Sequence, residues 1–202
     1  VLQADIWGAT AREIGRLAIL LVALLVGGTI PGATLGTGVA AWSISNGTSR
    51  RRWAASVVLY IAVVIVAIYA ALLIGSTAIV TARIASLGLT TNLAFPGVSS
   101  FAPLPGALFY AMVASAVSLV VGRAETGMIA AVSLAATEFV LSRIVGATPL
   151  FPSTLHQAAI GSLDTPLSPA LAAAALMAGG VAVAGATYRW LATSRDVPSR
   201  SA

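Results

Sequence analysis

Long uninterrupted apolar stretches dominate the pattern of hydrophobic and polar positions along the chain. Residues 17–49, 53–82 and 84–122 contain no charged side chain. Each of these stretches exceeds the roughly 20 apolar residues that a helix needs to cross the hydrocarbon core of a bilayer. Because the stretches are continuous rather than short and alternating, they favour transmembrane helices over a β-barrel. We therefore predict an all-α fold, a polytopic transmembrane helix bundle that forms a single domain over residues 1–202.

Five membrane-spanning helices are expected, over residues 16–42, 54–81, 104–121, 128–144 and 169–190. The first contains Pro31 and Gly32, where we expect a kink or a break, because proline removes a backbone hydrogen bond of a helix. The glycines around Pro31 also permit close contact between helices in a membrane.

The segments between and before the spans carry the polar and turn-forming residues. Residues 1–15 are predicted to form an N-terminal interfacial segment, and an amphipathic helix and a frayed terminus are equally compatible with them. Residues 84–105 form an expected external loop. Residues 146–168 are predicted to be a second external loop with a short helix, capped by Ser153 and ending near Ile160.

Composition agrees with a membrane location. The chain is 58% hydrophobic and 8% charged, whereas soluble domains carry roughly 25% charged residues. Its net charge of +5 comes from arginine alone, since there is no lysine. Because the arginines stand at the ends of the expected spans, membrane lipids explain them better than a nucleic acid partner. The chain has no cysteine and one histidine, so neither a disulfide nor a metal or other cofactor site is predicted.

The arginines also predict an orientation. Arg50–Arg52 form the densest basic cluster and should face the cytoplasm. Arg12 and Arg16 then lie on the outer side, which the same rule disfavours. We considered two explanations: a first helix that is absent or unusual, which we favour, and a re-entrant hairpin formed by residues 17–42.

A polar turn over residues 43–53 joins the first two expected spans. Asn46-Gly47 is a turn signal, and Thr48 or Ser49 can cap the helix that follows. The turn ends in Gly-Thr-Ser-Arg-Arg-Arg-Trp, residues 47–53, and the last span runs into an aromatic and basic segment, residues 188–197. Together these features resemble the permease subunits of ABC-2 type exporters. In the second segment Ser194 stands where that family would have an arginine.

The resemblance covers residues 32–197, and on it the five spans correspond to helices two to six of a six-helix permease whose first helix is absent or unusual here. It implies a bacterial cell-membrane protein that pairs with two ATP-binding subunits and with a second permease subunit, identical or homologous. It further implies an exporter of a lipophilic or amphipathic substrate, such as a drug, an antibiotic, a peptide or a lipid. The turn would be the element that docks on the ATP-binding subunit, through Asn46, Gly47, Thr48, Ser49, Arg50, Arg51, Arg52 and Trp53. From the residues alone, the same turn is explained as a topological anchor at the lipid headgroups.

Glu138 is the one acidic residue inside an expected span. A charge near mid-membrane costs a few kcal/mol, so Glu138 should face protein or water, or be protonated. Ser142 lies four residues further on the same helix face. The pair is either part of a transport or proton pathway or, as we slightly prefer, a structural hydrogen-bonding site between helices. Arg123 and Glu125 are expected to flank a turn, and His156 is expected to be a solvated loop residue.

No enzymatic activity is predicted for the chain itself. A phosphate-binding loop of the P-loop type needs a lysine, and the chain has none. ATP hydrolysis would therefore be carried out by a separate partner chain. The main alternative function is a non-transporting anchor or scaffold subunit of a larger membrane complex. A less favoured alternative is a proton-coupled carrier that uses Glu138.

Overall fold

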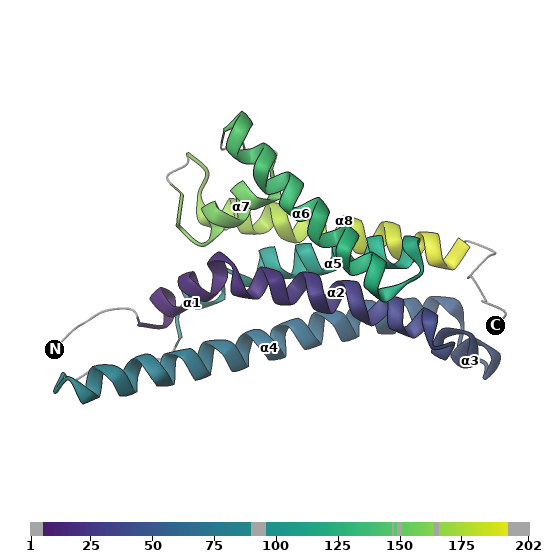
Figure 1. Cartoon of the computed structure of the whole chain (residues 1–202), viewed down its shortest axis with the longest axis horizontal. Coiled ribbons are helices and arrows are strands. Elements are labelled where there is room, and N and C mark those ends of the chain that lie inside the picture. The colour runs from purple at the N-terminus through teal and green to yellow at the C-terminus, as the bar shows by residue number, and fades with distance from the viewer. Residues whose placement is uncertain (1–5, 90–95, 147, 149–150, 164–165, 194–202) are drawn as a thin grey trace.

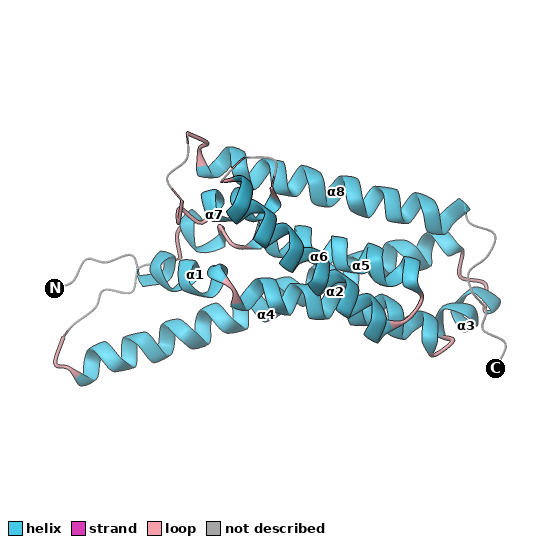
Figure 2. Ribbon diagram, turned by 45° about the horizontal axis from the view of Figure 1, so that its top comes forward, coloured by secondary structure: helices cyan, strands magenta, loops and turns pink. Residues whose placement is uncertain are grey.

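The computed structural model describes residues 6–89, 96–146, 148, 151–163 and 166–193, and these residues form helices joined by short loops, with no strand among them (Figures 1 and 2). The elements in chain order are α1 (Ile6–Arg16), α2 (Ala18–Gly36), α3 (Val39–Ser45), α4 (Arg50–Ser86), η1 (Val98–Phe101), α5 (Leu104–Val121), α6 (Ala124–Val145), α7 (Pro152–Ala159) and α8 (Pro169–Thr193). The predicted all-α fold class is confirmed.

Five of these segments are long and apolar enough to cross a membrane: Ala18–Gly36, Arg50–Ser86, Val98–Val121, Ala124–Val145 and Pro169–Trp190. Each of them overlaps one of the five predicted spans, and the chain is a multi-pass membrane protein. The other elements, α1, α3 and α7, have 11, 7 and 8 residues and are too short to cross.

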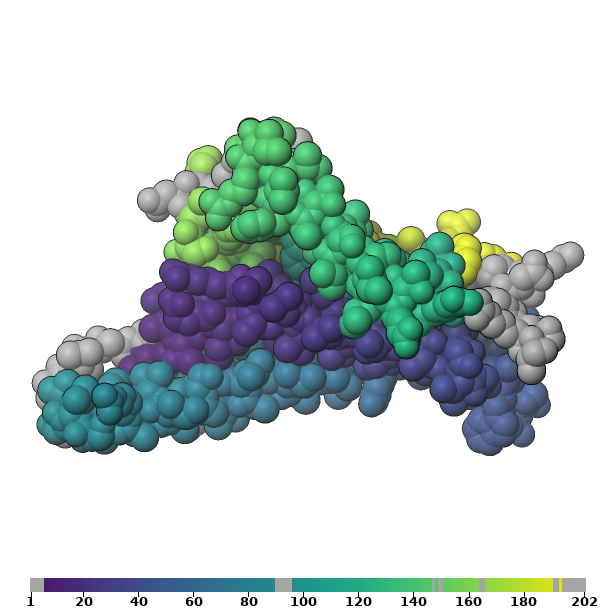
Figure 3. All heavy atoms as spheres, in the orientation of Figure 1, coloured from purple at the N-terminus to yellow at the C-terminus, as the bar shows by residue number. Residues whose placement is uncertain are grey.

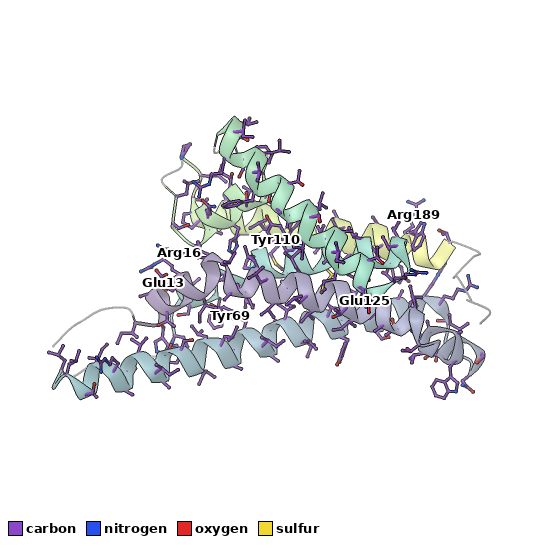
Figure 4. The ribbon with its side chains drawn as sticks, in the orientation of Figure 1. Glu13, Arg16, Tyr69, Tyr110, Glu125 and Arg189 are labelled. Atoms are coloured by element: carbon purple, nitrogen blue, oxygen red, sulfur yellow. The ribbon has the colours of Figure 1, made fainter. Side chains whose placement is uncertain are left out.

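The bundle has two distinct ends (Figure 1). One end, here called the arginine end, holds α3, the start of α4, the turn between α5 and α6, and the end of α8. The opposite end holds α1, η1, α7, the end of α4 and the start of α8. Glu125 and Arg189 accordingly lie at the arginine end, and Glu13 and Arg16 lie at the opposite end (Figure 4).

Close packing around α2 holds the centre of the bundle together. A Cβ atom placed on Gly27 would lie 2.2 Å from the backbone oxygen of Ala111 in α5. One placed on Gly32 would lie 2.4 Å from the backbone of Ala124 in α6. Glycine is therefore required at these two contacts, because no side chain fits between the helices. This confirms the prediction that the glycines near Pro31 permit close helix contact.

The helix α4 has 37 residues, which corresponds to about 55 Å at 1.5 Å per residue. Its buried side chains recur every four residues from Trp53 to Thr77. Beyond Thr77 no α4 residue is buried, and this end of the helix projects past its neighbours (Figure 3). The packing of α4 is therefore concentrated in the part that begins at the arginine end.

The boundaries of the first span differ from the prediction. The helix continues through Pro31 without a break and ends at Gly36, and Gly38 then takes a left-handed φ of 74° before α3. The break falls there because glycine adopts positive φ without steric cost. Since α2 is one continuous helix of 19 residues, the alternative of a re-entrant hairpin over residues 17–42 is wrong.

Two other helix starts were placed too late. Helix α4 begins at Arg50 rather than at residue 54, because Ser49 caps it and the arginines form its first turn. Helix α6 begins at Ala124 rather than at residue 128, because Gly122, with a φ of 71°, makes the turn almost alone. Residues 1–15 contain α1, so the helical alternative is confirmed for residues 6–15. Its buried side chains include Ile6, Ala11 and Ile14.

Candidate functional site

The carboxylate of Glu138 joins three helices at the opposite end. Its Oε2 accepts a hydrogen bond of 2.8 Å from the hydroxyl of Tyr110 in α5. Its Oε1 accepts two from Ser153 in α7, one of 3.0 Å from the backbone N–H and one of 2.6 Å from the hydroxyl. Tyr110 lies inside the bundle (Figure 4). Glu138 therefore makes the structural hydrogen bonds between helices that we preferred from the sequence.

The start of α7 explains why this carboxylate is needed. The first four N–H groups of a helix have no partner within the helix. In α7 the first helical residue is Pro152, which has no N–H, and Ser153 follows. Glu138 accepts the N–H of Ser153, and so supplies the partner that this group lacks within its own helix.

One sequence prediction about this region is wrong. Ser153 does not cap α7, since the residue preceding the helix is Phe151 and Ser153 bonds to Glu138 instead. The hydroxyl of Ser142, which the sequence places on the same helix face as Glu138, donates to the backbone oxygen of Phe139 within its own helix. Spacing along α6 identified Ser142, but the actual partners of Glu138 lie 28 and 15 residues away along the chain.

A cavity of about 240 Å³ lies beside this carboxylate. Glu138, Tyr110 and Ser153 are among the residues around it, but the surface that faces the cavity is almost entirely apolar. The rest of its wall is apolar and comes from Leu17 with α2 and from α6, and it includes Leu21, Leu24, Val132, Ala136 and Phe139. We call it the Glu138 cavity. Because Leu17, Leu21 and Phe139 are also exposed, the cavity opens towards the lipid-facing surface of the bundle.

His156 is buried nearby, at 1% exposure, so the prediction of a solvated loop residue is wrong. Its Nε2 lies 2.7 Å from the backbone oxygen of Gly15 at the end of α1. Its Nδ1 has no hydrogen-bond partner among the described residues. Burial lowers the pKa of His156 below its usual 6.5. The neutral ring, donating from Nε2, therefore joins α7 to α1.

The arginine end has a different character. Gly47 takes a φ of 86° in the turn after α3, and the hydroxyl of Ser49 accepts the N–H of Arg52 at 3.3 Å. This confirms the predicted turn and the predicted cap. The side chains of Arg51 and Arg52 are exposed, while Trp53 is 5% exposed and packs in the core. The turn is thus a basic surface attached to the bundle through a buried tryptophan.

A second cavity, of about 430 Å³, lies at the same end, between the end of α2 and the turn from α5 to α6. It is lined by Gly32, Gly36, Arg123 and Glu125, among others. The side chains of Arg123 and Glu125 are exposed, which agrees with their predicted place beside a turn.

The chain matches no protein-family model, no curated protein and no solved structure. A function for the chain is therefore inferred from the membrane fold, from the two ends of the bundle and from the sequence motif of the turn. The second segment of the resemblance, residues 188–197, is described only as far as Thr193, so its final residues lie outside the described part of the chain.

Within the described ranges, no group of three or more histidine, cysteine, aspartate or glutamate side chains is placed to hold a metal ion. Glu138 is hydrogen-bonded to a tyrosine and a serine, and His156 contacts a backbone carbonyl. At the opposite end, Glu138 and His156 join helices through hydrogen bonds. At the arginine end, the turn exposes the basic side chains of Arg51 and Arg52.

Proposed function

We propose that the chain is a membrane-spanning permease subunit of an ATP-driven ABC-2 type exporter, located in a bacterial cell membrane. The observation that carries the proposal is the turn over residues 46–53, which leads into the long helix α4, contains the Gly-Thr-Ser-Arg-Arg-Arg-Trp motif and exposes the side chains of Arg51 and Arg52. The side chains of Arg51 and Arg52 are accessible, and both residues belong to the first turn of α4, which crosses the bundle.

The turn is firmly attached to the bundle through the start of α4. Trp53, Ala54 and Val57 are buried at the start of α4, so this part of the helix cannot move without moving its neighbours. The cap on Ser49 keeps the first turn helical up to the arginines. A partner that displaces Arg51 and Arg52 would therefore displace α4 as a rigid element rather than unwind its end.

The partner must supply the nucleotide chemistry. Because the chain has no lysine, the P-loop type of phosphate site has to reside on a separate ATP-binding subunit. Two such subunits and a second permease subunit complete the proposed assembly. The arginine end would face the cytoplasm, in agreement with the positive-inside rule.

The proposed substrate is lipophilic or amphipathic. The substrate path would form between two permease subunits and be lined by α2, α4 and α6. The helix α6 supports this placement, because its described side chains are mostly exposed, including Leu134, Val140 and Ile144, and it leans away from the rest of the bundle (Figure 1). Such a face suits lipid, an apolar substrate or a second subunit.

Co-purification tests the proposal. The chain would be isolated from its native membrane with its partners, and ATPase activity would be measured for the wild type and for the double variant Arg51→Ala/Arg52→Ala. The matched control is Arg12→Ala/Arg83→Ala, which removes two exposed arginines from the opposite end. The proposal predicts that an ATPase co-purifies with the wild type and with the control and is lost from the double variant.

Absence of any co-purifying ATPase would end the permease proposal and favour the anchor or scaffold alternative. The proton-coupled carrier makes a separate prediction, since it requires Glu138. Transport that continues unchanged in Glu138→Gln would exclude that carrier mechanism while leaving the permease proposal intact.

A further inference from the structure

We propose that the cavity of about 430 Å³ at the arginine end binds the headgroup of phosphatidylethanolamine, with the phosphate on Arg123 and the ammonium group on Glu125. We call it the Arg123 cavity. The inference concerns binding by this chain alone, so it does not depend on the proposed ATP-driven function. Three observations lead to it: the place of the cavity at the ends of the spans, its partly polar wall, and two charged side chains of opposite sign in that wall.

The Arg123 cavity lies where the membrane spans end. Its wall comes from the end of α2, the end of α5 and the start of α6. These three spans end or begin beside the cavity, at Gly36, Val121 and Ala124. Ala33 and Val121, which line the cavity, are exposed on the outside of the bundle. A lipid headgroup can therefore enter the cavity while its acyl chains stay in the bilayer.

The surface that faces the Arg123 cavity is partly polar, whereas the surface that faces the Glu138 cavity is almost entirely apolar. Among the residues that line the Arg123 cavity, Thr37, Arg123 and Glu125 have polar side chains. The hydroxyl of Thr37 already donates a hydrogen bond of 2.7 Å to the backbone oxygen of Ala33. Arg123 and Glu125 are therefore the side chains that can bind a charged ligand here.

Arg123 and Glu125 do not neutralise each other. Residues two positions apart at the start of a helix do not face each other, and neither side chain forms an ion pair with another residue in the described part of the chain. Both side chains are exposed, so neither charge has been removed from water. Glu125 lies at the end of the bundle that α2 and α6 share (Figure 4). One positive and one negative group in the same wall match a ligand that carries both charges.

The two charges select phosphatidylethanolamine among common phospholipids. A guanidinium group binds phosphate oxygens through two parallel hydrogen bonds, and a primary ammonium group has three N–H donors for a carboxylate. Phosphatidylcholine has a quaternary ammonium group without an N–H, and phosphatidylglycerol has no positive charge to offset Glu125. The volume of about 430 Å³ lies within the range of roughly 300–1,000 Å³ that is typical of small-molecule sites.

Native mass spectrometry of the purified, delipidated chain in detergent tests the proposal. The probes are equimolar mixtures of dioleoyl-phosphatidylethanolamine with either dioleoyl-phosphatidylcholine or dioleoyl-phosphatidylglycerol. Because the ammonium group adds hydrogen bonds to Glu125, the wild type should bind at least about threefold more phosphatidylethanolamine than either competitor. Soluble glycerophosphoethanolamine at the same concentration should not compete. Equal binding of the lipids, or full competition by the soluble headgroup, would overturn the proposal.

Two charge variants assign the two contacts. Glu125→Gln should bring the binding of phosphatidylethanolamine down to that of phosphatidylcholine. Arg123→Gln should reduce the binding of phosphatidylethanolamine at least about threefold, because the phosphate loses a charge-assisted partner. The matched control is Arg189→Gln, an exposed arginine at the same end outside the cavity wall, and it should bind like the wild type. A preference for phosphatidylethanolamine that persists in Glu125→Gln would contradict the proposal.

A variant that fills the cavity tests the location independently of charge. Ala33→Phe should abolish the preference for phosphatidylethanolamine, because Ala33 lines the cavity and the ring would occupy it. The matched control is Ala41→Phe, on an exposed position of α3 at the same end and outside the cavity wall, and it should keep the preference. An Ala33→Phe variant that binds like the wild type would show that the lipid binds elsewhere and would overturn the proposal.

Discussion

The two ends of the bundle satisfy their polar groups in opposite ways. At the opposite end, buried polar bonds join segments far apart in the chain: His156 contacts Gly15, 141 residues away, and the hydroxyl of Tyr69 in α4 donates to the backbone oxygen of Ser100 in η1. At the arginine end, the side chains of Ser45 and Asn46 bond within four residues of themselves. One end is closed by its own long-range contacts, while the other presents exposed side chains at its surface.

This difference indicates where substitutions should destabilise the fold and where they should affect only association. A buried bond between distant segments contributes to tertiary stability, whereas a local bond at a helix end contributes mainly to that helix turn. The first two predictions below set a residue of the opposite end against a counterpart at the arginine end, and the last two concern one end each.

Gly106→Ala should destabilise the protein by about 2 kcal/mol or more. The added Cβ would lie 2.0 Å from Nδ1 of His156, so the ring would have to leave its place between α5 and α1. The counterpart is Gly36→Ala at the end of α2, where a Cβ would meet no atom within 4 Å. Unfolding in mixed micelles should separate the two variants clearly, and equal losses of stability would contradict the comparison.

Ser153→Ala should destabilise the protein by about 1 kcal/mol. The substitution removes the 2.6 Å bond from the hydroxyl to Glu138 and leaves the backbone bond in place. Its counterpart, Ser45→Ala, removes a local bond of an exposed residue and should change stability by less than about 0.5 kcal/mol. The same unfolding assay measures both variants. A larger loss of stability in Ser45→Ala than in Ser153→Ala would contradict the comparison of the two ends.

Lowering the pH should reduce the stability of the fold, because His156 is buried at the opposite end. Burial lowers the pKa of His156 below 6.5, so the unfolded chain binds a proton first as the pH falls. Stability from this group is therefore complete above about pH 6.5 and declines below it, by up to about 1.4 kcal/mol per pH unit. Unfolding measured at pH 7.0 and pH 5.5 tests the sign, and His156→Gln should lose this part of the pH dependence. A wild type that gains stability on acidification in this window would show that the ring is charged when folded.

Ser49→Ala should destabilise the protein by about 0.5–1 kcal/mol, and the effect should be confined to the first turn of α4. The hydroxyl accepts the N–H of Arg52, and its loss leaves that group to solvent. Hydrogen exchange should rise at Arg52 and Trp53 and remain unchanged at the other end of the helix. Protection that falls along the whole of α4 would mean that the cap supports the tertiary fold as well as the turn.

The sequence predicted the elements governed by local pattern. The five spans follow from hydrophobic length, and the turn at Asn46-Gly47 and the cap at Ser49 follow from residue type. The polarity of Glu138 also indicated an interhelical bond correctly.

The sequence could not predict contacts that depend on tertiary arrangement. His156 stands in a polar segment between two spans, and only the fold brings α1 and α5 around it. Ser153 has the residue type of a helix cap, but Pro152 already occupies the first position of α7 and Glu138 accepts the free N–H. Pro31 was expected to kink or break its helix, yet the helix continues through Pro31 and the break lies at Thr37 and Gly38, where a positive φ costs the glycine little.

The most direct measurement of the central claim uses the absence of cysteine in the natural chain. Single cysteines would be introduced as Asn46→Cys in the exposed turn and as Leu87→Cys at the far end of α4, where the side chain is also exposed. Each variant would be labelled with a maleimide photocrosslinker in native membranes, and the products would be identified by mass spectrometry. The account predicts a crosslink from Asn46→Cys to an ATP-binding subunit and none from Leu87→Cys. A crosslink to that subunit from Leu87→Cys, or from neither position, would contradict it.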